Sequence, residues 1–160
     1  MHWALLPLKR YADFAGRSRR MEYWSFALLN LVVITVLIAP VFFAMVSALA
    51  VADPNMPGGD EAVAEAMMAS FGIGTTIASL LFSLYFLAVL IPSIAVVVRR
   101  LHDRDMSGWW YPGFLVASFI PFIGFLASIA FLVLMFLPGT PGPNRFGPDP
   151  KGGVDPETFT

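Results

Sequence analysis

Two long runs of apolar residues, separated by short polar segments, dominate the pattern of hydrophobic and polar positions along the chain. Residues 23–52 contain no charged side chain, and neither do residues 70–98. Each run exceeds the ~20 residues that an α-helix needs to cross a hydrocarbon core of ~30 Å. The pattern therefore predicts two membrane-spanning helices, over residues 23–51 and 70–98.

A third uncharged stretch, over residues 109–137, is interrupted by proline and glycine, and two interpretations of it remain open. In one, it is a single tilted span that places the chain's end outside. In the other, it turns at residues 121–124 and forms a proline-broken hairpin that returns the end to the inside. A first arm of about eleven residues is too short to cross alone, so such a hairpin is re-entrant. We favour the hairpin.

The resulting fold class is an all-α integral membrane protein, a small bundle of four helical segments, with three spans as the alternative. Its composition agrees, since 58% of the residues are hydrophobic and 13% are charged. Residues 1–150 form one membrane domain, and residues 138–160 are a tail rich in proline and glycine. We expect residues 151–160 to be disordered.

The signs of the charges predict an orientation. The cytoplasmic interfacial segment, residues 1–22, carries five Lys and Arg residues, whereas the loop over residues 53–69 has four acidic residues and no basic one. Lys and Arg favour the cytoplasmic side, so the N-terminus and the basic turn over residues 99–108 lie inside and the acidic loop lies outside. Within that loop, Asp60 is a candidate N-cap for a short helix. The first apolar run is too long for a cleaved signal peptide, which indicates an uncleaved anchor.

Aromatic side chains mark the ends of the apolar stretches. We expect four of them to lie at the membrane interface, namely Tyr23, Trp24, Trp109 and Trp110. Residues 1–22 combine apolar side chains with cations and therefore belong at the headgroup layer or against the helix ends.

The polar cluster over residues 99–105 is the strongest candidate for chemistry. A zinc site needs three or four ligands from His, Cys or carboxylates, but the chain has two histidines and no cysteine. Acid–base catalysis needs a substrate pocket beside His102 and Asp103, and the sequence identifies none. We therefore predict no catalytic, metal or cofactor site. Instead, Arg99 and Arg100 are expected to meet the helix dipole and lipid phosphates, with exposed aspartate pairs contributing about 0 to 1 kcal/mol each.

Three motifs, in this order and spacing, indicate a family. They are YADFAGRSRRMEYW at residues 11–24, RRLHD with SGWW at residues 99–110, and PGTPGPNRFGPDP at residues 138–150. Together they resemble the bacterial inner-membrane proteins known as domain of unknown function 805. The resemblance implies an integral protein of the bacterial inner membrane with no established activity. The apolar runs and the signs of the charges add that it is multi-pass with its N-terminus in the cytoplasm.

If the tail is inside, the polar residues of the three motifs share one cytoplasmic face and can form a single network. This candidate network consists of Arg17, Arg19, Glu22, Arg99, Arg100, His102, Asp103, Asn144 and Arg145. In the C-terminal motif, Phe146 adds an aromatic side chain that can dock on the helix ends.

We predict a protein without catalysis whose cytoplasmic face binds anionic lipid headgroups or a partner protein, and not nucleic acid. The basic residues 17–20 lack the spacing of a phosphate loop and are typical of a juxtamembrane cluster that attracts headgroups. Two alternatives remain open, a component of a transporter or channel, acting as a homo-oligomer or with a membrane partner, and an enzyme acting on lipid headgroups. The absence of charge within both predicted spans argues against an ion-coupled transporter.

Overall fold

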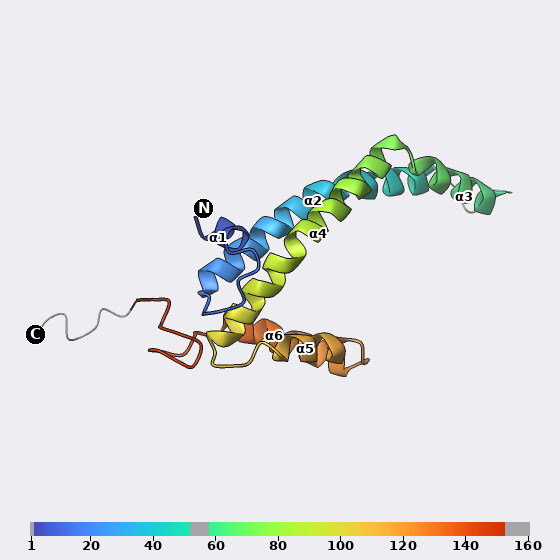
Figure 1. Ribbon diagram of the computed structural model, residues 1–160. Helices are drawn as coiled ribbons and strands as arrows, with labels where there is room; N and C mark the ends of the chain where they lie inside the picture. The colour runs from blue at the N-terminus through green and yellow to red at the C-terminus, as the bar shows by residue number, and fades with distance from the viewer. Residues whose placement is uncertain (1, 52–57, 153–160) are drawn as a thin grey trace, which may run out of the picture. The chain divides into compact units, whose positions relative to one another are not determined.

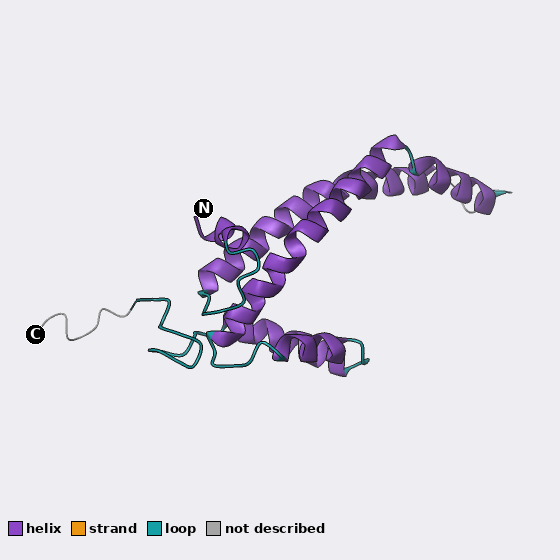
Figure 2. Ribbon diagram, in the orientation of Figure 1, coloured by secondary structure: helices purple, strands orange, loops and turns teal. Residues whose placement is uncertain are grey.

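The computed structural model describes residues 2–51 and 58–152, and this part of the chain is helical (Figures 1 and 2). The all-α class is confirmed. The described residues form six helices where the bundle was predicted to have four segments: one of the two additional short helices lies in the outer loop, where a short helix was expected, and the other lies near the N-terminus. The six helices are α1 (His2–Lys9), α2 (Arg20–Val51), α3 (Gly59–Ser70), α4 (Ile73–His102), α5 (Trp110–Ser118) and α6 (Ile123–Phe136).

The chain divides into two compact units, and both long helices contribute to each. The terminal unit comprises Met1–Leu28 and Leu90–Thr160, and the central unit comprises Leu29–Val89. All three sequence motifs fall in the terminal unit. It also contains the largest group of buried side chains in the described residues, including Ala95, Val96 and Leu101 of α4.

The central unit presents apolar side chains outward. Val36 and Phe43 on α2 are 65% and 68% exposed, and Leu87 on α4 is 62% exposed. Apolar exposure on this scale over two helices of membrane-spanning length is expected for surfaces that face lipid. A polar contact joins the two helices inside this unit, where the Tyr85 hydroxyl donates to Asn30 Oδ1 at 2.8 Å.

The outer loop differs from the prediction at its helix ends. The residue that precedes α3 is Gly58, with a left-handed φ of 79°, so the predicted N-cap role of Asp60 is wrong. Asp60 instead lies in the first turn, where it complements the positive end of the helix dipole. A break at Phe71 and Gly72 separates α3 from α4, which moves the start of the second long helix from residue 70 to Ile73. The predicted turn chemistry of residues 53–57 lies outside the described residues, as do residues 153–160.

The basic turn begins later than predicted, because α4 continues through Arg99 and Arg100 to His102. The helix then ends in a Schellman motif. The Met106 amide donates to the Leu101 carbonyl and the Asp105 amide to the His102 carbonyl, both at 3.0 Å. Asp105 occupies the left-handed position at φ 57°, which aspartate tolerates better than most residues. The turn therefore covers residues 103–109, and Arg99, Arg100 and His102 belong to the last helical turn.

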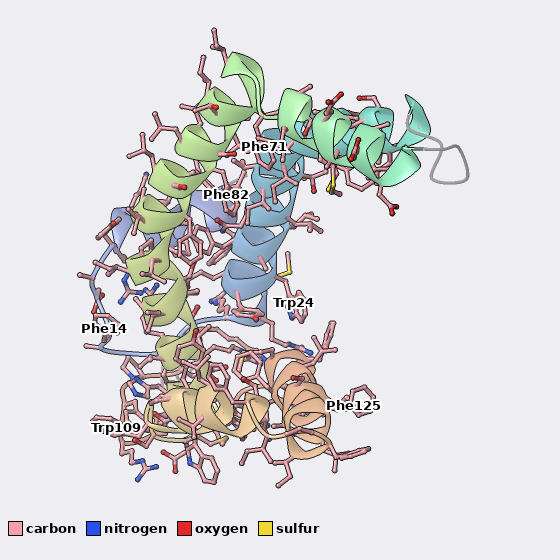
Figure 3. All side chains as sticks on the ribbon, turned by 90° about the vertical axis from the view of Figure 1, so that its right-hand side faces the viewer. Phe14, Trp24, Phe71, Phe82, Trp109 and Phe125 are labelled. Atoms are coloured by element: carbon pink, nitrogen blue, oxygen red, sulfur yellow. The ribbon has the colours of Figure 1, made fainter. Side chains whose placement is uncertain are left out.

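Residues 109–137 form two helices joined by a turn, α5 and α6, which lie side by side (Figures 1 and 3). The turn reverses the chain at Phe122, whose φ is 64°. Gly124 permits the close approach, since a Cβ there would lie 2.5 Å from the Ser118 carbonyl oxygen. The aromatic side chains at this tip are exposed, and Figure 3 shows Phe125 pointing away from α5.

Candidate functional site

Asp103, directly after α4, is the acceptor at the centre of a buried cluster of charges. The Arg17 Nε atom donates to its Oδ1 atom at 3.0 Å, and Arg17 Nη2 lies 2.9 Å from the same oxygen. On the other side, Arg100 Nη1 donates to Oδ2. The three side chains are at most 5% exposed. One carboxylate therefore holds two guanidinium groups out of contact with solvent.

A second buried ion pair connects the start of α2 to the end of α4. Glu22 Oε1 lies 3.0 Å from Arg99 Nη2, with both side chains at most 3% exposed, and the Ser18 amide donates to the Arg99 carbonyl at 3.1 Å. The expectation that these arginines pair at an exposed surface and reach lipid phosphates is wrong. They are buried because residues 17–22 and the tail cover the end of α4.

The C-terminal end of α6 is capped by donors from α2 and α4. Arg100 donates to the carbonyls of residues 135 and 137, and Arg20 donates to the Phe136 carbonyl at 3.1 Å. The Trp24 indole packs on the Phe136 ring with centroids 4.1 Å apart. Cations favour the negative end of a helix dipole, so these contacts fix where α6 ends.

Backbone carbonyls of the tail complete the cluster. Arg17 donates to the carbonyls of Thr140 and Gly142, each at 2.6 Å, and the Thr140 amide donates back to the Asp103 carbonyl at 2.8 Å. Arg19 donates to the Pro150 carbonyl at 2.5 Å. These contacts give the proline- and glycine-rich segment a defined path, although it contains no helix.

The C-terminal motif is fastened to the turn after α4. The Asn144 side-chain amide donates to the His102 carbonyl at 2.9 Å, and the Phe146 ring stacks on the His102 ring at 3.9 Å with the planes 4° apart. Arg145 pairs with Asp105 at 3.1 Å, and here both side chains are exposed. The motif therefore holds His102 from its backbone and from one ring face.

Two further carboxylates stabilise local turns. A hydrogen bond from Arg10, at 2.9 Å, lowers the pKa of Asp13. The Asp149 carboxylate accepts the Lys151 amide at 2.9 Å and the Gly142 amide at 3.2 Å, and chiefly the first of these bonds lowers its pKa. Both carboxylates therefore stay charged to a lower pH than an ordinary aspartate.

The family described as "Protein of unknown function (DUF805)" matches residues 11–148. The chain belongs to the DUF805 family. Its relatives include inner membrane protein YhaH of Escherichia coli (strain K12), which is 43% identical over 151 residues, 94% of this chain and 98% of that protein. Inner membrane protein YhaI of the same strain is 36% identical over 153 residues, 96% of this chain and 98% of that protein. No solved structure matches the chain.

These relatives and the two long apolar helices together make this DUF805 chain an inner membrane protein. The family range includes the side chains of the buried cluster, from Arg17 to Asp103, and the tail carbonyls of Thr140 and Gly142 that complete it. In the described part of the chain, no three His, Asp or Glu side chains are grouped so as to hold a metal ion.

All nine residues of the candidate network lie in the terminal unit, but their environments differ. Arg17, Glu22, Arg99, Arg100 and Asp103 are buried, His102, Asn144 and Arg19 are partly buried, and Arg145 is exposed. The interface anchors also differ. Trp109 and Trp110 are 83% and 54% exposed, whereas Tyr23 and Trp24 are half-buried and pack on each other at 5.2 Å.

Sequence reasoning did not place Arg20, Gly139 and Thr140 in the cluster. Gly139 lies so close to the Asp103 carboxylate that an added Cβ would collide with it. The available signal was the spacing of the third motif, in which small and turn-forming residues alternate. That spacing does not reveal that backbone carbonyls are the acceptors.

Proposed function

We propose that this DUF805 protein is a non-enzymatic inner-membrane protein whose cytoplasmic face binds the headgroups of anionic phospholipids. The main support is that the Lys and Arg side chains of the terminal unit fall into two classes, those that are buried and those that remain at the surface. The buried arginines are directed inward, to Asp103, Glu22 and backbone carbonyls. Other cations remain at the surface of the same unit, including Lys9 and Arg20, which form no ion pair within the described residues.

The contacts among the three motifs support a common side of the membrane for them. The start of α2, the end of α4 and the end of α6 are joined by hydrogen bonds from Arg20 and Arg100. Since the membrane cannot separate bonded groups, the tail belongs on the side of residues 17–22 and 99–105. The excess of Lys and Arg there assigns that side to the cytoplasm.

This orientation makes the α5–α6 hairpin re-entrant. At 1.5 Å per residue, α5 and α6 are about 14 and 21 Å long, shorter than the ~30 Å core. The hairpin tip carries Phe119 and Phe122, which are 81% and 88% exposed. Apolar helices of this length are typical of re-entrant or interfacial segments, and exposed apolar side chains such as these are typical of a surface that meets the membrane.

Apolar and cationic groups lie next to one another at the proposed headgroup layer. Lys9 ends α1, where Leu5 and Leu8 are exposed, and Arg20 precedes Met21, which is 61% exposed. Such a surface suits a phosphodiester with acyl chains better than a polar protein partner. The acid and base groups of the cluster are used in mutual pairs, which supports a binding role without catalysis.

Native mass spectrometry of the purified chain with added phosphatidylglycerol tests the proposal. We expect retention of phosphatidylglycerol in preference to phosphatidylcholine, and weaker retention in the double variant Lys9→Gln, Arg20→Gln. At ~1 kcal/mol for each cation near an anionic surface, the two changes weaken binding roughly 30-fold. The control Lys9→Arg, Arg20→Lys keeps both charges and retains the lipid.

Equal retention of the two lipids by the unmodified protein, or an unchanged preference in the neutralised variant, contradicts the proposal. Capture of a stoichiometric protein partner by the same surface, lost in the same variant, also contradicts it. Thermal unfolding of each variant in detergent separates loss of binding from loss of the Arg20 bond to α6.

A further inference from the structure

The His102 side chain is held by more contacts than its position at the end of a helix requires. Its Nδ1 atom lies 3.2 Å from the Gly16 carbonyl oxygen, its ring stacks on Phe146, and its own carbonyl accepts from Asn144. A carbonyl oxygen only accepts hydrogen bonds, so Nδ1 must carry the proton. In the neutral ring, Nε2 therefore presents a lone pair in a fixed direction.

His102 lines an open surface cavity of about 560 Å³, a volume within the range of small-molecule sites, and its Nε2 atom is on the side of Gly108, another lining residue. Within the described residues, Nε2 has no hydrogen-bond partner. Gly108 packs closely on Val98 beside the imidazole, because an added Cβ at this position would lie 2.7 Å from Val98 and 3.5 Å from Nε2.

The lining combines two aromatic side chains with two hydrogen-bonding groups. Phe14 and Trp109 lie on the same side of the end of α4 (Figure 3), and Ser107 and His102 supply a hydroxyl and the imidazole lone pair. The lining contains neither a Lys or Arg for an anion nor a carboxylate for a cation. Aromatic side chains and a fixed acceptor suit a neutral planar ring that bears a hydrogen-bond donor.

We propose that the cavity binds a neutral aromatic ring carrying a hydroxyl group, the chemistry shared by phenols and quinols. The hydroxyl donates to His102 Nε2, and the ring packs against Phe14 and Trp109. The cavity adjoins the last residue of a membrane-spanning helix and the exposed Trp109, so a ring can enter from the lipid or from the water. This site uses none of the cations in the proposed headgroup surface.

The test measures binding of 4-octylphenol to the full chain in nanodiscs, relative to empty nanodiscs of the same lipid. Its methyl ether, 4-octylanisole, has the same ring and tail but no donor, and should bind about tenfold more weakly because one hydrogen bond is lost. His102→Phe keeps the stacked ring but removes the acceptor, so it should abolish the difference between the two probes. A second measurement uses p-cresol, which has the phenol ring but not the octyl tail. It distinguishes a ring that reaches the site from the lipid from one that reaches it from the water.

The two adjacent tryptophans give a matched control. Trp109→Leu removes a cavity wall at a site that is 83% exposed, so folding is preserved and binding of the phenol should fall severalfold. Trp110→Leu changes an exposed neighbour outside the cavity and should leave binding unchanged. Equal binding of phenol and ether, equal losses in both tryptophan variants, or no binding above empty nanodiscs of any phenol overturns the proposal.

Discussion

Replacing Asp103 by asparagine tests whether the buried cluster holds the terminal unit together. The carboxylate accepts Arg17 and Arg100 and is 5% exposed. Asparagine supplies one oxygen for one guanidinium but turns an NH2 group toward the other. Removing one partner of a buried ion pair costs about 3 to 5 kcal/mol. For a chain of this length, that free energy corresponds to a fall in melting temperature of roughly 6 to 20 °C.

Asp105→Asn is the matched control, two residues along the same turn. Its ion pair with Arg145 is exposed, at 48% and 61% for the two side chains, so its loss costs about 0 to 1 kcal/mol. Asparagine also tolerates the left-handed backbone that Asp105 adopts. Thermal unfolding in mild detergent, followed by tryptophan fluorescence, compares the two variants. Equal stability losses would refute the argument that burial makes Asp103 structurally dominant.

Three further substitutions test other parts of the structure. Gly139→Ala places a Cβ against the Asp103 carboxylate, so we expect thermal stability in the same assay to fall by about 1 to 3 kcal/mol. Tyr85→Phe removes the bond to Asn30 between the long helices, and chemical unfolding should show a loss of about 0.6 kcal/mol, the mean for such bonds in membranes. Because its folded-state pKa is lowered from 3.8, Asp13 stabilises the folded state above that pH and ceases to do so as the pH falls through the folded value. Asp13→Asn should therefore flatten the pH dependence of melting below pH 3.8, whereas an unchanged profile contradicts this assignment.

The two long helices were predictable from the sequence, because an uncharged run of this length can be recognised from its residue types without knowledge of any tertiary contact. Their ends were less so. α2 begins at Arg20 and α4 extends to His102, whereas the predicted spans stop where charges begin. Charge ends a hydrophobic run without ending a helix. At the end of α4, Glu22 and Asp103 pair with Arg99 and Arg100, so this helix continues through the two arginines.

Burial of the cluster was beyond sequence reasoning for a different reason. Arg99 and Arg100 have the composition of an exposed juxtamembrane cluster, and they are buried because residues 17–22 and the tail cover them. The tail's path depends on backbone acceptors at Thr140 and Gly142, which no side-chain pattern reveals. By contrast, the docking of Phe146 was predictable in kind, because an aromatic within a turn-rich segment needs a surface to pack on.

The side of the membrane on which the tail lies tests the central claim most directly. The chain contains no cysteine, so single cysteines introduced at Lys151 and at Asp60 report only their own positions. Both residues are exposed. In intact spheroplasts treated with a membrane-impermeant maleimide, the account predicts labelling of Asp60→Cys, with Lys151→Cys labelled only after the membrane is opened. Labelling of Lys151→Cys in intact spheroplasts would contradict the proposal that the three motifs form a single cytoplasmic face.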